Sequence, residues 1–109
     1  MADQHTMTDL TKRKPIRSNA ILQAAKDEAC ACCGVNDGTT VFAHINAQWA
    51  GKGLGIKADD FGMFLCRLCH DQYDGRDKHP LEDWEILKAV YRTWVRLIDK
   101  GIITVKDMK

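Results

Sequence analysis

The chain has 109 residues, of which 45% are hydrophobic and 28% are charged. This is enough for one small domain, and it excludes a disordered or collagen-like chain. No apolar stretch approaches the roughly 20 residues that span a bilayer, and the first residues lack the apolar segment of a signal peptide. We therefore expect a cytoplasmic protein without a membrane partner.

The net charge is only +1, but the charges are unevenly distributed. Residues 10–57 carry seven basic and three acidic side chains, residues 58–83 carry three and seven, and residues 84–109 carry six and three. An acidic centre between two basic segments suits a site that binds cations and faces an anionic polymer. Chance variation over such short windows explains the pattern equally well.

The N-terminal half is predicted to hold an arm, a helix and a strand. Residues 1–17 form a flexible basic arm, and Ser18 is the N-cap of a helix over residues 19–28. An Asn-Asp-Gly turn at residues 36–38 leads into a strand over residues 39–45, which is rich in β-branched side chains. A glycine-rich loop follows this strand.

The C-terminal half begins with a second strand at residues 62–65 and a short helix that ends at Gly75. A long amphipathic helix is predicted over about residues 80–100, and residues 102–105 are apolar enough for a short strand. The apolar positions of the long helix are Leu81, Trp84, Leu87, Tyr91, Trp94, Val95 and Ile98. The order α-β-β-α-α predicts one α+β domain over residues 18–109.

Five cysteines are many for a reducing compartment, where disulfides are rare. Two C-x-x-C pairs can supply the four thiolates of a structural zinc site, which would stabilise so small a domain by on the order of 10 kcal/mol. The pairs are Cys30 with Cys33 and Cys66 with Cys69. A C-x-C pair of Cys30 with Cys32 is the alternative, but Gly34 suits a turn that presents Cys33.

The two cysteine pairs frame a strand that contains Ala43-His44-Ile45, and the second pair continues directly into His70. The pattern CxxCG, AHI and LCxxCH with a following acidic residue resembles the HNH endonucleases over about residues 30–76. More narrowly, the basic arm, the glycine-rich loop and CHDxxD are similar to the YbcO-like nucleases of phages and prophages. The resemblance implies a ββα-metal (HNH) core with a treble-clef zinc site, between an N-terminal and a C-terminal helix.

The resemblance also implies a metal-dependent DNA endonuclease, acting in phage or prophage DNA processing or recombination inside a bacterial host cell. It implies that His44 is the general base and that His70 binds a catalytic divalent ion such as Mg²⁺, Mn²⁺ or Ni²⁺. The chemistry agrees, because histidine suits a base near neutral pH. His70 and Asp74 share one helix face at i and i+4, so both can bind one ion. Arg67 is predicted to hold the phosphate in the transition state.

Two departures from the HNH pattern concern the catalytic metal. Many of these enzymes have a metal-binding Asp before the catalytic His, where this chain has Ala43. Asp74 is the candidate for the missing carboxylate, and Asp71 is the alternative. The middle Asn of the family name is also absent, and Asp60 is predicted to take its role of pinning the loop.

Basic side chains on the arm, around the glycine-rich loop and after the metal helix are predicted to contact DNA phosphates. They are Lys12, Arg13, Lys14, Arg17, Lys52, Lys57 and Arg76. The loop sequence GKGLG is no P-loop, and a solvated loop explains it equally well. Trp84, Tyr91 and Trp94 fall on the apolar stripe of the long helix, which indicates core or a homodimer surface rather than base stacking.

The leading hypothesis is therefore an HNH-type DNA endonuclease. The alternative is a non-catalytic zinc-finger module that binds DNA or protein, which Ala43 favours, and another zinc or redox protein is a third. A second metal site at His70, separate from the cysteines, would distinguish the nuclease from the binding module.

Overall fold

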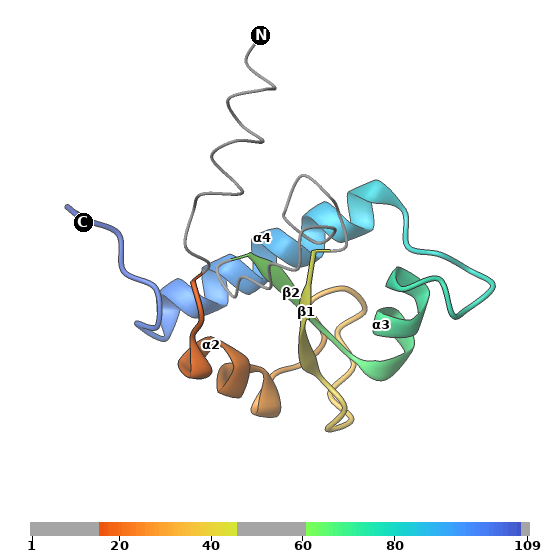
Figure 1. Ribbon diagram of the computed structural model, residues 1–109, viewed down its shortest axis with the longest axis horizontal. Helices are drawn as coiled ribbons and strands as arrows, with labels where there is room; N and C mark the ends of the chain where they lie inside the picture. Colours follow the sequence, from red (N-terminus) through yellow and green to blue (C-terminus); the bar gives the residue numbers. More distant parts are fainter. Residues whose placement is uncertain (1–15, 46–60, 108–109) are drawn as a thin grey trace, which may run out of the picture.

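The computed structural model describes residues 16–45 and 61–107, and it confirms the α+β class (Figure 1). Within these two segments, a two-stranded sheet is accompanied by three α-helices and one 3-10 turn. In chain order the elements are α2 (Asn19–Ala24), η1 (Ala25–Asp27), β1 (Val41–His44), β2 (Gly62–Leu65), α3 (Arg67–Tyr73) and α4 (Asp83–Asp99). Among the described residues, no helix combines the length and the apolar character needed to cross a membrane.

Helix α2 begins where the sequence predicts it. The backbone N–H of Ile21 donates to the Ser18 hydroxyl oxygen at 3.2 Å, which is the hydrogen bond of an N-cap. The α-helix is shorter than predicted, because the chain tightens into η1 after Ala24. Ile21 and Ala25 are buried, so this short helical segment covers one side of the core.

Strands β1 and β2 pair antiparallel, with Val41 opposite Leu65 and His44 opposite Gly62. All four residues of β2 are buried, so this strand is the centre of the core. A Cβ atom at position 62 would lie 2.5 Å from the carbonyl oxygen of Ala43 and 2.6 Å from the Phe42 ring. The hairpin therefore needs glycine at position 62 for the two strands and this ring to approach so closely.

Helix α4 lies behind the sheet in Figure 1, with α2 near one end and α3 near the other. It begins at Asp83 rather than at residue 80, because Glu82 is the N-cap and forms a capping box with Glu85. The helix contacts β2 more extensively than any other helix does. It buries Ala89, Val90, Thr93 and Leu97 against the core.

The predicted apolar face of α4 is largely on the outside, so it does not form the core, and the alternative expectation of a homodimer surface stays a prediction. Trp84, Leu87 and Tyr91 are 59%, 70% and 68% exposed. Small side chains on the opposite face, Ala89 and Thr93, let the helix approach β2 closely, and they decide which face is buried.

The short strand expected at residues 102–105 does not form. The N–H groups of Ile102 and Ile103 both donate to the carbonyl oxygen of Leu97, and Gly101 N–H donates to Ile98. Gly101 has a φ of +72°, so the helix ends in a Schellman-type turn. These N–H groups close the helix and are not available to a sheet.

Candidate metal centre and adjoining cleft

The first cysteine pair lies on a tight turn after η1. Gly34 N–H donates to the Cys30 carbonyl oxygen at 3.0 Å, and Gly34 has a φ of +85°. The Cys33 N–H points at the Cys30 sulfur at 3.5 Å, which is typical of a turn that presents two thiolates to one ion. The turn is anchored to β2, because Ala31 N–H donates to the Phe64 carbonyl oxygen at 2.7 Å.

The second cysteine pair lies where β2 passes into α3. Cys66 is the N-cap residue of α3, and Cys69 lies in its first turn. The four sulfur atoms of Cys30, Cys33, Cys66 and Cys69 lie within 4.8 Å of one another. Those of Cys33 and Cys66 are 3.7 Å apart, close to the roughly 3.8 Å edge of a tetrahedron with metal–sulfur bonds of about 2.3 Å. The cluster can therefore hold a structural metal such as zinc.

The ionisation of these thiols also suits a cation. Burial disfavours the Cys30 thiolate, but backbone N–H groups around Cys33 and Cys66 outweigh it and lower the pKa of Cys30 to about 7. Burial first, and then the neighbouring Cys30 thiolate, raise the pKa of Cys69 far above its ordinary value. One negative charge thus forms readily, and further thiolates need a positive ion beside them.

Cys33, rather than Cys32, belongs to the cluster, as the sequence predicts. Cys32 is buried in the core, only 4% exposed, and burial raises the pKa of its thiol.

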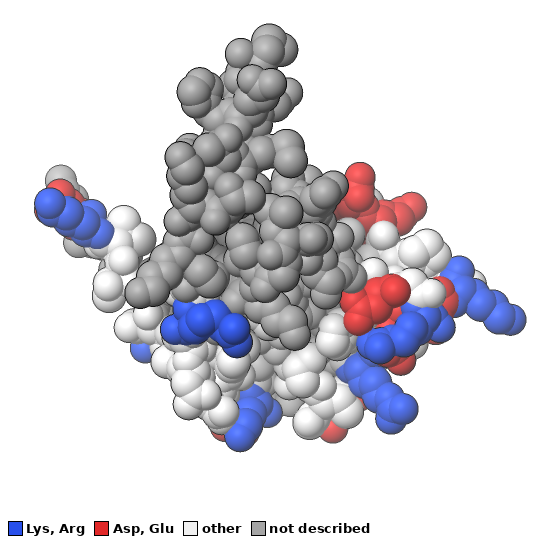
Figure 2. All heavy atoms as spheres, in the orientation of Figure 1, with Lys and Arg blue, Asp and Glu red and all other residues white. Residues whose placement is uncertain are grey.

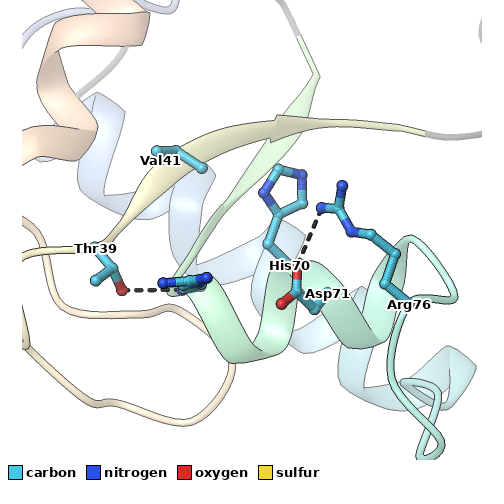
Figure 3. Close-up of a pocket in the computed structure, with 6 residues that line it drawn as sticks. Thr39, Val41, His70, Asp71 and Arg76 are labelled. Carbon is cyan, nitrogen blue, oxygen red and sulfur yellow. Dashed lines mark hydrogen bonds and ion pairs between the residues drawn. The ribbon is translucent and has the colours of Figure 1, made fainter.

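A cleft of about 530 Å³ adjoins the second cysteine pair. Helix α3 presents His70 and Asp71 to it, and Figure 3 shows the His70 ring pointing from α3 toward β1. The residues that line the cleft are Thr39, Val41, Arg67, His70, Asp71 and Arg76. Two arginines in so small a space favour an anionic ligand, and the structure thus brings Arg67 and Arg76 together with His70.

His70 and Asp74 meet on one face of α3, as their spacing predicts. The Nε2 atom of His70 lies 3.3 Å from Oδ2 of Asp74. Two donors this far apart can bind one ion at roughly a right angle with bonds of about 2.0–2.2 Å, so the pair fits a divalent metal. Among the described residues, no third metal-ligating side chain joins this pair in a cluster.

Arg76 holds the two carboxylates of this helix face. Its NH2 group lies 3.0 Å from Asp74 Oδ2 and 3.1 Å from Asp71 Oδ1. Asp71, the alternative ligand, lines the same cleft as His70, and its carboxylate pairs with Arg76.

His44 lies on β1, three residues beyond Val41 of the cleft, and is half-buried. Its ring packs edge-on against Phe42, with 5.4 Å between the ring centroids and an interplanar angle of 90°. Phe42 in turn packs against Phe64 and over Gly62. Phe42 therefore connects the His44 ring to the core. The described residues that line the cleft do not include His44.

Thr39 belongs to the cleft but was not predicted as a site residue. Its hydroxyl oxygen accepts a hydrogen bond from Arg67 N–H at 2.9 Å, at the first turn of α3, and the hydroxyl donates to Asp37 at 2.6 Å. The Asn-Asp-Gly turn signal placed Asp37 and Thr39 in a turn, but no pattern links them to Arg67, which is 28 residues away.

Several predicted site residues lie outside the described residues. They are Lys12, Arg13, Lys14, Lys52 and Lys57, which were predicted to contact phosphates, and Asp60, which was predicted to pin the loop. Arg17 is described and exposed, just before α2. Figure 2 shows acidic and basic side chains next to each other over the region of α3 and the segment that follows it. On this face the described charges are mixed and do not form a continuous basic surface.

Comparisons with known proteins found one family model and one solved structure that are similar to this chain. A family model described as "Putative nuclease YbcO" matches residues 15–102. A solved structure, described as "a putative bacteriophage protein" from Escherichia coli strain K-12 substrain MG1655, is 27% identical with a TM-score of 0.53. The match covers 73% of this chain and 98% of that one. No curated protein matched the chain.

Proposed function

Because this chain belongs to the YbcO nuclease family, we propose that it is an HNH-type endonuclease that hydrolyses phosphodiester bonds of DNA with a divalent metal ion. Its role would be DNA processing or recombination for a phage or prophage, in the cytoplasm of the bacterial host. The similarity to the structure described as a bacteriophage protein supports this setting.

The observation that carries the proposal is the close approach of His70 and Asp74 beside two arginines. The 3.3 Å between His70 Nε2 and Asp74 Oδ2 fits a single ion. Cys66 and Cys69 hold the first turn of α3, so a zinc at the four cysteines would fix the helix that carries both ligands. A structural ion and a reactive ion would then both be bound by residues of the same short helix.

In this proposal the chemistry is divided between residues of the cleft and His44, which lies on β1 outside the residues that line the cleft. A divalent ion would stabilise negative charge on the phosphate and the leaving oxygen. Arg67 and Arg76 bind the phosphate oxygens, since guanidinium groups match phosphate in geometry and charge. His44 removes a proton from the attacking water as the general base, and its ring packs edge-on against Phe42.

The alternative is a non-catalytic zinc-finger module that binds DNA or protein. Two observations favour it. Ala43, where many HNH enzymes have a metal-binding Asp, is buried and brings no ligand. Arg76 already neutralises Asp71 and Asp74, the carboxylates that would otherwise attract a cation. The two functions differ in whether the cleft cuts DNA or only binds it.

Cleavage of supercoiled plasmid tests the proposal. We expect the purified chain to nick the plasmid with Mg²⁺, Mn²⁺ or Ni²⁺, and EDTA to stop the reaction. His44→Ala should lower the nicking rate by about 100-fold or more, since general bases contribute factors of this size. His70→Ala should lower it strongly as well, because it removes a ligand of the divalent ion.

His79→Ala is the matched control, because this histidine is 84% exposed and pairs only with Asp77 among the described ion pairs. It should cut like the wild type. Zinc content and melting temperature, measured for every variant, separate loss of chemistry from loss of fold. If the wild type binds DNA but cuts it with none of the metals, the binding module is the better account.

A further inference from the structure

Helix α4 has two apolar faces, and the core covers only one of them. The second face, which we call the outer stripe, consists of Trp84, Leu87, Tyr91 and Val95. Val95 is 37% exposed, and the other three are more than half exposed. A helix that is apolar on two faces is typical of one that is covered on both.

The outer stripe is large enough for a specific contact. Large side chains carry roughly 150–250 Å² each, so these four leave about 500 Å² exposed on one copy. Patches of about 300–600 Å² on a monomer are often functional. Two such patches facing each other bury about 1,000 Å², which is the lower limit of a specific interface.

The spacing of the stripe is symmetric about Tyr91. Leu87 and Val95 lie four residues before and after it, and Trp84 and the partly buried Ile98 lie seven residues before and after it. A two-fold axis through Tyr91, perpendicular to the helix, therefore sets Leu87 of one copy against Val95 of the other. It likewise sets Trp84 against Ile98, so the stripe is complementary to itself in antiparallel packing.

We propose that the outer stripe of α4 is a homodimer interface, in which a second copy of this chain packs antiparallel across Tyr91. The antiparallel arrangement also opposes the two helix dipoles, which favours the pair. Lys88 lies 5.1 Å from the centroid of the Trp84 ring and covers the edge of the stripe with charge. Because the buried area is modest, the dimer should dissociate reversibly in the micromolar range.

Sedimentation equilibrium of the full chain, loaded with zinc, tests the proposal. Across the micromolar range the apparent mass should rise from one chain to two. Leu87→Glu and Tyr91→Glu should each weaken the dimer by at least ten-fold, because both place a charge in the centre of the interface. Gln23→Glu adds the same charge at an exposed position of α2, away from the stripe, and should dimerise like the wild type.

Zinc content and circular dichroism show that each variant is folded, which is expected because Leu87 and Tyr91 are exposed. A wild type that stays monomeric over the whole range overturns the proposal. A dimer that persists in Leu87→Glu and Tyr91→Glu also overturns it, since the interface then lies elsewhere. A monomeric wild type whose DNA binding depends on Leu87 and Tyr91 would assign the stripe to nucleic acid instead.

Discussion

Thr93 joins the long helix to the centre of the sheet through one hydroxyl group. It lies in the middle of α4 and is 1% exposed. Its hydroxyl oxygen accepts a hydrogen bond from the buried Phe64 N–H at 2.8 Å, and the hydroxyl O–H donates one to the Ala89 carbonyl oxygen at 2.7 Å. The hydroxyl therefore satisfies a strand N–H that has no partner within the two-stranded sheet.

Thr93→Val should lower the free energy of unfolding by about 1–3 kcal/mol. Valine keeps the shape of threonine but leaves the Phe64 N–H buried without an acceptor. Urea denaturation of the zinc-loaded protein measures the change. Thr104→Val, at an exposed position after α4, is the control and should stay within about 0.5 kcal/mol of the wild type. Equal losses at both positions would mean that the Thr93 hydroxyl contributes nothing specific.

At this scale, the sequence identifies residues whose chemistry depends on local spacing. The four clustered cysteines and the pair of His70 with Asp74 follow from i+3 and i+4 spacing. Thr39 and Thr93 could not be identified, because each bonds a residue 28 or 29 positions away. Threonine is common, and only the tertiary structure shows which hydroxyl caps a helix or a strand.

At the scale of elements, helix α2 is the one whose stability depends most clearly on its N-cap. It has only six residues, so its own hydrogen bonds stabilise it little, and the Ser18 cap is a large part of its local stability. Ser18→Ala should cost about 1 kcal/mol of unfolding free energy, whereas Ser18→Asp keeps an acceptor and should cost little. Thermal unfolding compares the two, and equal losses would show that the cap hydrogen bond is not what stabilises the helix.

The bounds of the predicted elements are most accurate where one local sequence feature, such as an apolar run or a glycine after a helix, determines where the element begins or ends. Strand β2 has the predicted bounds, and α3 ends before Gly75, which has a φ of +79°. For helix α4 the sequence left core and homodimer surface open for the apolar stripe, because apolar side chains occupy most of the circumference of the helix. Periodicity cannot choose between two apolar faces, and the close fit of Ala89 and Thr93 to β2 made the choice.

At the scale of the whole molecule, the cysteine cluster joins segments that are distant in the sequence. Arg96 donates to the Ala29 carbonyl oxygen at 2.6 Å, just before the first cysteine pair. Arg96 and Lys100 also pair with Glu28, which ties the end of α4 to the same segment. The cysteine cluster, β2 and α4 are therefore linked to one another, and a metal at the four sulfurs would stabilise all three together.

Removal of the metal should therefore unfold the protein as a whole. A structural zinc contributes on the order of 10 kcal/mol, which is comparable to the entire stability of a small domain. A strong chelator should abolish the cooperative thermal transition, and added Zn²⁺ should restore it. Cys33→Ser should bind zinc more weakly and melt at a lower temperature, even though Cys33 is the exposed cysteine and serine fits its position.

Cys32→Ser is the complementary test. Cys33 is exposed and belongs to the cluster, whereas Cys32 is buried and lies outside it. Cys32→Ser loses some packing but keeps all four ligands, so its zinc content should equal that of the wild type. If burial rather than metal binding governed stability, Cys32→Ser would be the more damaging of the two substitutions. The order of the two melting temperatures, measured on samples of known zinc content, therefore shows whether this fold is held by its metal or by its apolar core alone.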